Sequence, residues 1–439
     1  MRGPFIKSII ISALLLHSAY AFPIFMYWAA FLFLIPIFMI SSLNGFRFGC
    51  LWGLCFYGLH CYPIATVLYL RGQGDYRLLV YLFLVLFFAI QSGFWFLCSH
   101  FIELYSSRHM RPLITMGYFV WMQTMVFWLF DICEGYPFAL PIIPIAHHER
   151  LLQLLPLMGV YGMTMALIAG QWFIACALKQ YQYSLLACGC FIPFLLGYAI
   201  QKQELIPEYI KHIVYISPEW ECMHPYDTAQ DITYCLQKAA EQYKRGVCFI
   251  MPESAYPFSL SSYQTDLWQS VLYHNKQQII IGAHKKSDKT SINTLFHLDQ
   301  CRIIQTYEKK HSVILTERTP FYLKGIYFFT HLFGGNTDRS PIKKDKRSIY
   351  SLLIRIYNYY FLPVLCSELF YNDFSSLPYK KAPILLLCND GWFHFYYIRY
   401  CMLLYAKIYA IRWKRPIIYI SHSNGFFISE TGRVVALLQ

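Results

Sequence analysis

The stretch "FLPVLCSELF", residues 361–370, is an apolar run that ends at Cys366 and continues into Glu368. A short apolar run that is followed by polar residues is typical of a buried strand. Because α/β proteins place their chemistry at strand ends, Cys366 is a candidate nucleophile. The alternative is a structural thiol, since a free cysteine packs as a small hydrophobic side chain.

Two other apolar runs in this half of the chain end in charged residues. "GVCFIMPE" reaches Glu253, and "CRIIQTYEKK" reaches Lys309. Taken singly, Glu253 fits a surface carboxylate and Lys309 fits a charged turn. Further strands are expected in "HIVYIS", "QQIIIGAHK", "NTLFHLD", "APILLLCNDGWF" and "PIIYISHSNGFFISETGRV", with helices over 229–244 and 396–413. Residues 203–439 therefore form an α/β domain in which helices cover the sheets.

Residues 1–202 have a different composition. The whole chain is 57% hydrophobic and only 14% charged, against about 25% charged in soluble domains. Uncharged runs cover residues 8–46, 48–70, 78–102, 112–130, 151–178 and 180–200. A membrane-spanning helix needs about 20 apolar residues, so the first run, 39 residues long, has room for two spans with a turn near Pro23. The pattern predicts a transmembrane helical domain of about seven spans.

The basic residues indicate the orientation of this domain. With a cytoplasmic N-terminus, the inner loops hold Arg2, Lys7, Arg47, Arg108, Arg111 and Lys179, and the outer loops hold Arg71, Arg77 and Arg150. Six against three favours this orientation. Seven spans then place the second domain on the outer side of a bacterial inner membrane. The net charge of +13 suits anionic lipid head groups, and without a basic stripe or reader motif no nucleic-acid partner is expected.

No cofactor or metal is expected from the sequence. The chain has 15 cysteines, but no CxxC pair is followed by a second pair of His or Cys ligands. His147 and His148 lie in the proline-rich loop 133–162, either as ligands or as part of a solvated surface.

The ordered set of motifs resembles the apolipoprotein N-acyltransferases, membrane-embedded members of the carbon-nitrogen hydrolase (nitrilase) superfamily. The motifs are "MPESAYPF", "YEKKHSVILTERTP", "CSELF", "NDGWF", "RPIIYISHSNGFFISETGRV" and, in the membrane part, "LLQLLPLMGVYG". The resemblance implies an αββα sandwich with a Glu253–Lys309–Cys366 triad, supported by Glu317 and Glu368. It also implies transfer of an acyl chain from a phospholipid to the α-amine of the S-diacylglyceryl cysteine of a lipoprotein.

The chemistry explains why these residue types belong together. Acyl transfer can pass through a thioester on a cysteine, and a neighbouring cation such as Lys309 favours the thiolate. Glu253 would move the proton from the thiol to the leaving group and later accept the proton of the amine. Glu317 and Glu368 would orient Lys309 and the amine.

Some motif positions depart from the family pattern. Ser367 stands where an aromatic residue is usual, "VILTE" replaces a Pro-Phe-Gly before the glutamate, and Arg412 stands where a glutamate is usual. We therefore expect a divergent member of the family. Because the sequence stops at Gln439, soon after "ETGRV", it is also expected to be short at its C-terminus, and a monomer is the default expectation. Two alternatives remain: a membrane-tethered amidase or transferase with another amine acceptor, and a non-catalytic membrane module that retains the fold.

Overall fold

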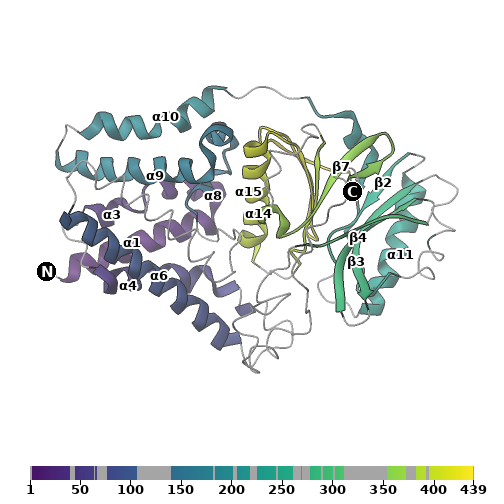
Figure 1. Ribbon diagram of the computed structural model, residues 1–439, viewed down its shortest axis with the longest axis horizontal. Coiled ribbons are helices and arrows are strands. Elements are labelled where there is room, and N and C mark those ends of the chain that lie inside the picture. The colour runs from purple at the N-terminus through teal and green to yellow at the C-terminus, as the bar shows by residue number, and fades with distance from the viewer. Residues whose placement is uncertain are drawn as a thin grey trace. The chain divides into compact units, whose positions relative to one another are not determined.

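The structure is a computed structural model that describes most of the chain, in two compact units (Figure 1). The described residues are 2–39, 45–63, 65–66, 77–105, 140–180, 183–200, 205–217, 225–243, 246–260, 268, 277–287, 290–299, 302–310, 353–371, 382–391 and 395–438. The first unit comprises Met1–Lys202 and Phe393–Arg412, and the second comprises Gln203–Trp392 and Trp413–Gln439.

The first unit is helical. Its longer helices are α1 (Arg2–Ala21), α4 (Gly45–His60), α6 (Arg77–Tyr105), α9 (Leu155–Lys179), α10 (Ser184–Ile200) and α15 (Tyr396–Trp413). Within the described residues, three helical segments are long and apolar enough to cross a membrane: Gly3–Ala21, Tyr81–Phe101 and Leu155–Lys179. These segments support association with a membrane, and the count of about seven spans remains a prediction. The span expected over 112–130 lies outside the described residues.

The first apolar run does not continue as two regular spans. α1 ends at Ala21, and the short helices α2 (Pro23–Met26), η1 (Tyr27–Phe31) and α3 (Ile35–Phe38) follow. Proline lies in the first turn of α2 and of α3, where its missing N–H is tolerated. The buried Gln171 side chain completes this irregular backbone, because its amide accepts from Leu34 N at 2.7 Å and donates to Ala30 O at 3.0 Å. Irregular backbone inside an apolar helical unit needs such partners.

Helices α4 and α6 lie side by side (Figure 1), and they pack through small residues. Gly49 and Gly53, one helical turn apart, lie against the backbone of α6. A Cβ on Gly53 would come within 2.6 Å of Ala89 Cα, and one on Gly49 would collide with Ser92 O. Small residues at this spacing let two helices approach closely.

The second unit contains two sheets, in agreement with the expected α/β domain. The first sheet has the order β1 (Ile213–Tyr215), β2 (Cys248–Ile250), β3 (Gln278–Ser287), β4 (Thr290–Asp299), β5 (Arg302–Glu308). The second has the order β11 (Val434–Ala436), β10 (Gly425–Ile428), β9 (Ile417–Ile420), β8 (Ile384–Leu387), β7 (Tyr359–Leu365), β6 (Ile354–Ile356). Strands β1, β2 and β3 are parallel, as are β7, β8 and β9, and all other pairs are antiparallel.

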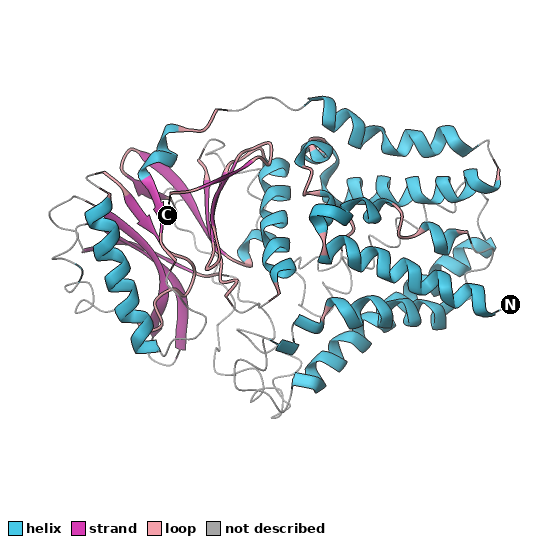
Figure 2. Ribbon diagram, turned by 180° about the vertical axis from the view of Figure 1, so that it is seen from behind, coloured by secondary structure: helices cyan, strands magenta, loops and turns pink. Residues whose placement is uncertain are grey.

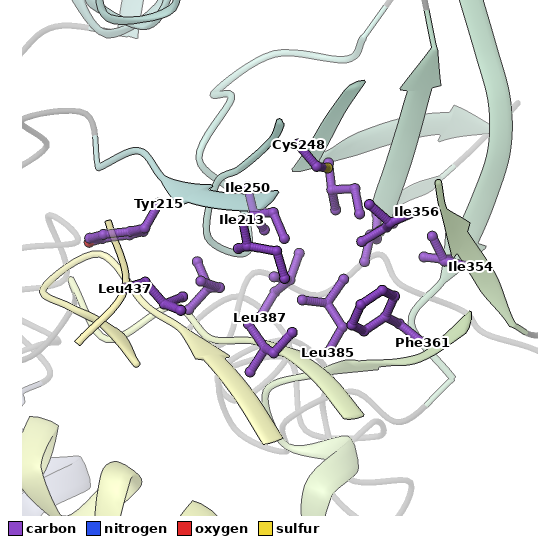
Figure 3. Packing of buried hydrophobic residues seen from close by; sticks show 14 of the residues in the cluster. Ile213, Tyr215, Cys248, Ile250, Ile354, Ile356, Phe361, Leu385, Leu387 and Leu437 are labelled. Carbon is purple, nitrogen blue, oxygen red and sulfur yellow. The ribbon is translucent and has the colours of Figure 1, made fainter. Parts of the chain in front are cut away.

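Alternating side chains of β2 build two cores. Cys248 and Ile250 join a cluster with Leu385 and Leu387 of the second sheet (Figure 3). Phe249 packs instead with residues of α11 (Pro225–Gln242) on the opposite face. Successive strand residues point to opposite faces, so one strand serves both cores. Figures 1 and 2 show α11 along the outer face of the first sheet.

The second unit is therefore built from three layers, a helix and two sheets. This arrangement supports the predicted α/β sandwich. The helix predicted over 396–413 is observed as α15, which groups with the first unit.

Candidate active site

Glu253 lies in the loop that follows β2. Its side chain is buried, and the next residue, Ser254, has a φ of 55°. The loop lies against β3, where Gly282 N donates to Pro252 O at 3.2 Å and Gly282 O accepts from Tyr256 N at 3.1 Å. A Cβ on Gly282 would come within 2.5 Å of Glu253 Cα. Only glycine permits this approach, so Gly282 determines where Glu253 lies.

Lys309 follows β5 and forms an ion pair with Glu253. Lys309 Nζ lies 2.7 Å from Glu253 Oε1, and the two side chains are 1% and 3% exposed. Asn293 of β4 contributes to both partners, because its Nδ2 donates to Glu253 Oε1 at 3.2 Å and its O accepts from Lys309 N at 2.8 Å. A buried charge pair of this kind is stable only when further hydrogen bonds satisfy it.

Cys366 is the first residue after β7 and is partly exposed. Its φ of 44° lies in the left-handed region, which non-glycine residues seldom occupy. Its N–H donates to Leu387 O at 2.8 Å, so the residue extends the pairing of β7 with β8. A strained residue held by a regular ladder is a frequent feature of functional sites.

Cys388 lies directly after β8, and its thiol interacts electrostatically with both Cys366 and Glu253. Burial raises the pKa of the Cys388 thiol well above its usual value, and the pKa is raised further by a hydrogen bond with the Cys366 thiol and by the charges of Cys366, Glu253 and Asp390. The Cys388 thiol therefore lies within electrostatic reach of both Cys366 and Glu253. Two of the three predicted triad members, Glu253 and Lys309, form an ion pair, and the third, Cys366, pairs through its backbone with the strand that ends beside Cys388.

Glu368, in the short helix α14 (Glu368–Tyr371), joins the ends of β5 and β7. Its buried carboxylate accepts from Leu365 N at 2.9 Å, from Lys310 N at 2.5 Å and from Tyr307 OH at 3.0 Å. Leu365 and Lys310 are the chain neighbours of Cys366 and Lys309. Glu368 therefore links the two sheets at the positions from which these side chains project. The sequence predicted a supporting role for Glu368, and its bonds to the backbone are a finding of the structure.

Burial raises the pKa of the Tyr307 hydroxyl, and the charge of Glu368 raises it further. Tyr307 therefore stays protonated and donates to the carboxylate. Glu317, the other predicted supporting residue, lies outside the described residues.

Further polar residues of the site were not singled out from the sequence. His422, two residues after β9, shares a hydrogen bond of 3.0 Å between its Nε2 and Glu253 O. Asp390, three residues after β8, accepts from Ser423 N at 3.3 Å. Both lie at carboxyl ends of parallel strands, so the rule that singled out Cys366 could also have found them.

The described residues offer no cluster of three or more His, Cys, Asp or Glu that could hold a metal ion. His147, one of the two histidines considered as a ligand, is partly buried, and its Nδ1 lies 2.6 Å from Tyr400 OH. His148 is exposed.

Comparison with known proteins gives distant structural likenesses, of which two are described here. No family model matches the chain, and no curated protein matches its sequence. The chain is similar to a cysteine-to-alanine mutant of an amidase from the nitrilase superfamily of Nesterenkonia AN1, with 11% identity over 54% of this chain and 89% of that chain and a TM-score of 0.35. It is also similar to a CN-hydrolase superfamily protein of Xanthomonas campestris with an arsenic adduct in the active site, with 14% identity, 52% and 85% coverage and a TM-score of 0.33. At these values neither likeness decides the fold or the activity.

Proposed function

We propose that the protein is a membrane-bound N-acyltransferase of the apolipoprotein N-acyltransferase type, within the nitrilase superfamily. It would move an acyl chain from a phospholipid, through a thioester on Cys366, to the α-amine of the S-diacylglyceryl cysteine of a lipoprotein. The observation that carries this proposal is the buried Glu253–Lys309 ion pair. It is supported by Cys366, a strained and partly exposed cysteine at a strand end of the same unit.

In the first step, the Cys366 sulfur attacks the ester carbonyl of the phospholipid. Glu253 accepts the thiol proton and passes it to the departing alkoxide of the lysophospholipid, so that the C–O bond breaks as the C–S bond forms. Lys309, positioned by its bond to Glu253, would stabilise the oxyanion, and one such donor is worth about 3 kcal/mol.

In the second step, the amine of the lipoprotein attacks the thioester carbonyl. Glu253 accepts the amine proton and returns it to the Cys366 sulfur as the C–S bond breaks and the amide forms. The low exposure of Glu253 and Lys309 helps to keep water from the thioester, because hydrolysis would release a free fatty acid.

A lipid substrate explains why the chain also carries an apolar helical unit. One face of α6 leaves large apolar side chains exposed at four-residue steps: Leu78, Leu82, Leu86, Ile90 and Phe94. Such a stripe is favourable against lipid and unfavourable in water. Transfer of an acyl chain into water costs about 0.8 kcal/mol per CH₂, so an enzyme that stays in the bilayer avoids this cost. We place the second unit on the outer side of the inner membrane, as the basic loops predict.

The test uses the full chain in liposomes that contain a phospholipid labelled in its acyl chain. We expect the label on Cys366 as an acyl-thioester that hydroxylamine removes, and its transfer to a synthetic peptide with an S-diacylglyceryl cysteine. Cys366→Ala should abolish labelling. The matched control is Cys188→Ala, because Cys188 is an exposed cysteine of α10 outside the site.

The outcomes separate the proposal from its alternatives. A labelled Cys366 that transfers only to another amine indicates a different acceptor. Cleavage of a small amide without lipid labelling indicates an amidase. A folded protein whose Cys366 takes no label from either substrate would overturn the proposal and favour a non-catalytic module.

A further inference from the structure

Cys366 and Cys388 are direct neighbours on adjacent parallel strands. Leu365 pairs with Leu387 in the register of β7 and β8, so the next residue of each strand is a cysteine. The N–H of Cys366 donates to Leu387 O at 2.8 Å, which carries the ladder one step beyond the last paired residues. Adjacent strands lie about 4.8 Å apart, and the Cα atoms of a disulfide are usually about 4.4–6.8 Å apart. The backbone therefore holds the two cysteines at a separation that a disulfide accepts.

The two thiols also lie within electrostatic reach of each other, since Cys366 contributes to the raised pKa of the Cys388 thiol. The two cysteines differ in solvent exposure. Cys366 is partly exposed, and Cys388 is 1% exposed. A reagent from solution therefore meets Cys366 before Cys388. Oxidation occurs first at the more accessible thiol. Cys366 therefore fits the role of the thiol that is oxidised, and Cys388 fits the role of the resolving thiol that forms the disulfide.

We propose that Cys366 and Cys388 form a redox-active dithiol, a modification site that a hydroperoxide converts reversibly into an intramolecular disulfide. The inference goes beyond the proposed acyl transfer and depends only on the placement of the two thiols.

The chemistry takes two steps. The Cys366 thiolate attacks one peroxide oxygen, the O–O bond breaks, and the alkoxide leaves and takes a proton from water, which gives a sulfenic acid. The Cys388 sulfur then attacks the Cys366 sulfur, the S–O bond breaks, and the hydroxide leaves as water with the Cys388 proton. The two thiols lose two electrons in total and the hydroperoxide gains them. A small dithiol such as dithiothreitol reverses the reaction by exchange.

The disulfide has two consequences for the site. It removes the sulfur of Cys366 from nucleophilic chemistry, so the site is blocked until a thiol reduces it. It also prevents further oxidation of Cys366 to the sulfinic acid, which small thiols do not reverse.

The experiment treats the full chain in detergent with hydrogen peroxide and follows the cysteines by mass spectrometry. In the wild type we expect a peptide pair crosslinked between Cys366 and Cys388, with a mass loss of about 2 Da because two hydrogen atoms leave. Dithiothreitol should restore both thiols. In Cys388→Ser and Cys388→Ala, no such crosslink should form, and Cys366 should accumulate as sulfinic acid at least tenfold more than in the wild type. Cys188→Ser, outside the site, should behave as the wild type.

The inference fails if wild-type Cys366 reaches the sulfinic acid as fast as it does in the Cys388 variants, or if its crosslink leads to another cysteine. The wild-type measurement decides this even if a Cys388 variant does not fold. Because the readout is a mass and not an acyl transfer, the result is independent of the proposed function. A protein that forms the disulfide but accepts no acyl chain would support the dithiol and refute the transferase.

Discussion

Replacement of Glu368 with glutamine should make local opening easier at the ends of both β5 and β7. The glutamine oxygen can keep the N–H of Leu365 and the hydroxyl of Tyr307, which both bind Oε2, but it turns an NH₂ group toward Lys310 N. One N–H without an acceptor costs about 1–3 kcal/mol, and the change from charged to neutral acceptors weakens the other bonds by roughly 1 kcal/mol. We therefore expect Glu368→Gln to lower the free energy of opening at this site by about 3 kcal/mol.

The assay is hydrogen–deuterium exchange of the full chain in nanodiscs, read at the amides of Leu365 and Lys310. A loss of about 3 kcal/mol corresponds to roughly 100-fold faster exchange at both amides. The matched control is Glu308→Gln, one residue before Lys309. Glu308 forms an ion pair of 2.9 Å with Lys285, but their side chains are 46% and 48% exposed, and an exposed pair of this kind contributes about 0–1 kcal/mol.

Leu365 is the last residue of β7 in the second sheet, and Lys310 follows β5 of the first sheet, so the joint response of the two amides is the decisive observation. Faster exchange at Leu365 alone would mean that Glu368 only caps its own turn. If the exchange of both amides in Glu368→Gln matched that in Glu308→Gln, the carboxylate would not join the two strands, and the reasoning would be refuted.

Three further predictions follow from close packing and burial. Gly282→Ala should displace Glu253, because the new Cβ would lie 2.5 Å from Glu253 Cα. The rate of thioester formation should then fall at least tenfold, while the circular dichroism spectrum stays unchanged. Gly53→Ala should lower the thermal unfolding temperature in detergent, whereas Gly189→Ala, with no atom within 4 Å of its Cβ, should not. Burial lowers the pKa of His297 from 6.5 to about 4, so the unfolded state takes up this proton first as the pH falls. The free energy of unfolding should therefore fall by roughly 3 kcal/mol between pH 6.5 and pH 4, and His297→Gln should reduce this slope in urea titrations; an equal slope would contradict the assignment.

The pattern of apolar and polar residues along the sequence was enough to predict most of the strands of the second unit. Each apolar run that the sequence marked as a strand is a strand. In the fully buried strands β2, β8 and β9 the reason is that burial on both faces favours an apolar side chain at every position. Glu253, Lys309 and Cys366 could be singled out for the same reason, since the end of an apolar run is visible in the sequence. Pro23 likewise marked the end of α1. The continuity of the next span could not be judged, because the backbone there depends on Gln171, 137 residues from Leu34.

The sequence by itself determined which segments are strands, which helices are apolar and which polar residues stand at strand ends, because these properties depend on neighbours a few positions away. Only the tertiary structure decided which strand ends meet. The bond from Lys309 to Glu253 spans 56 residues, the three hydrogen bonds of Glu368 join two sheets, and the adjacent positions of Cys366 and Cys388 follow from the register of β7 on β8. Partners of this kind are set by strand order and register, and a register is selected by the packing of the whole sheet, which no single segment specifies.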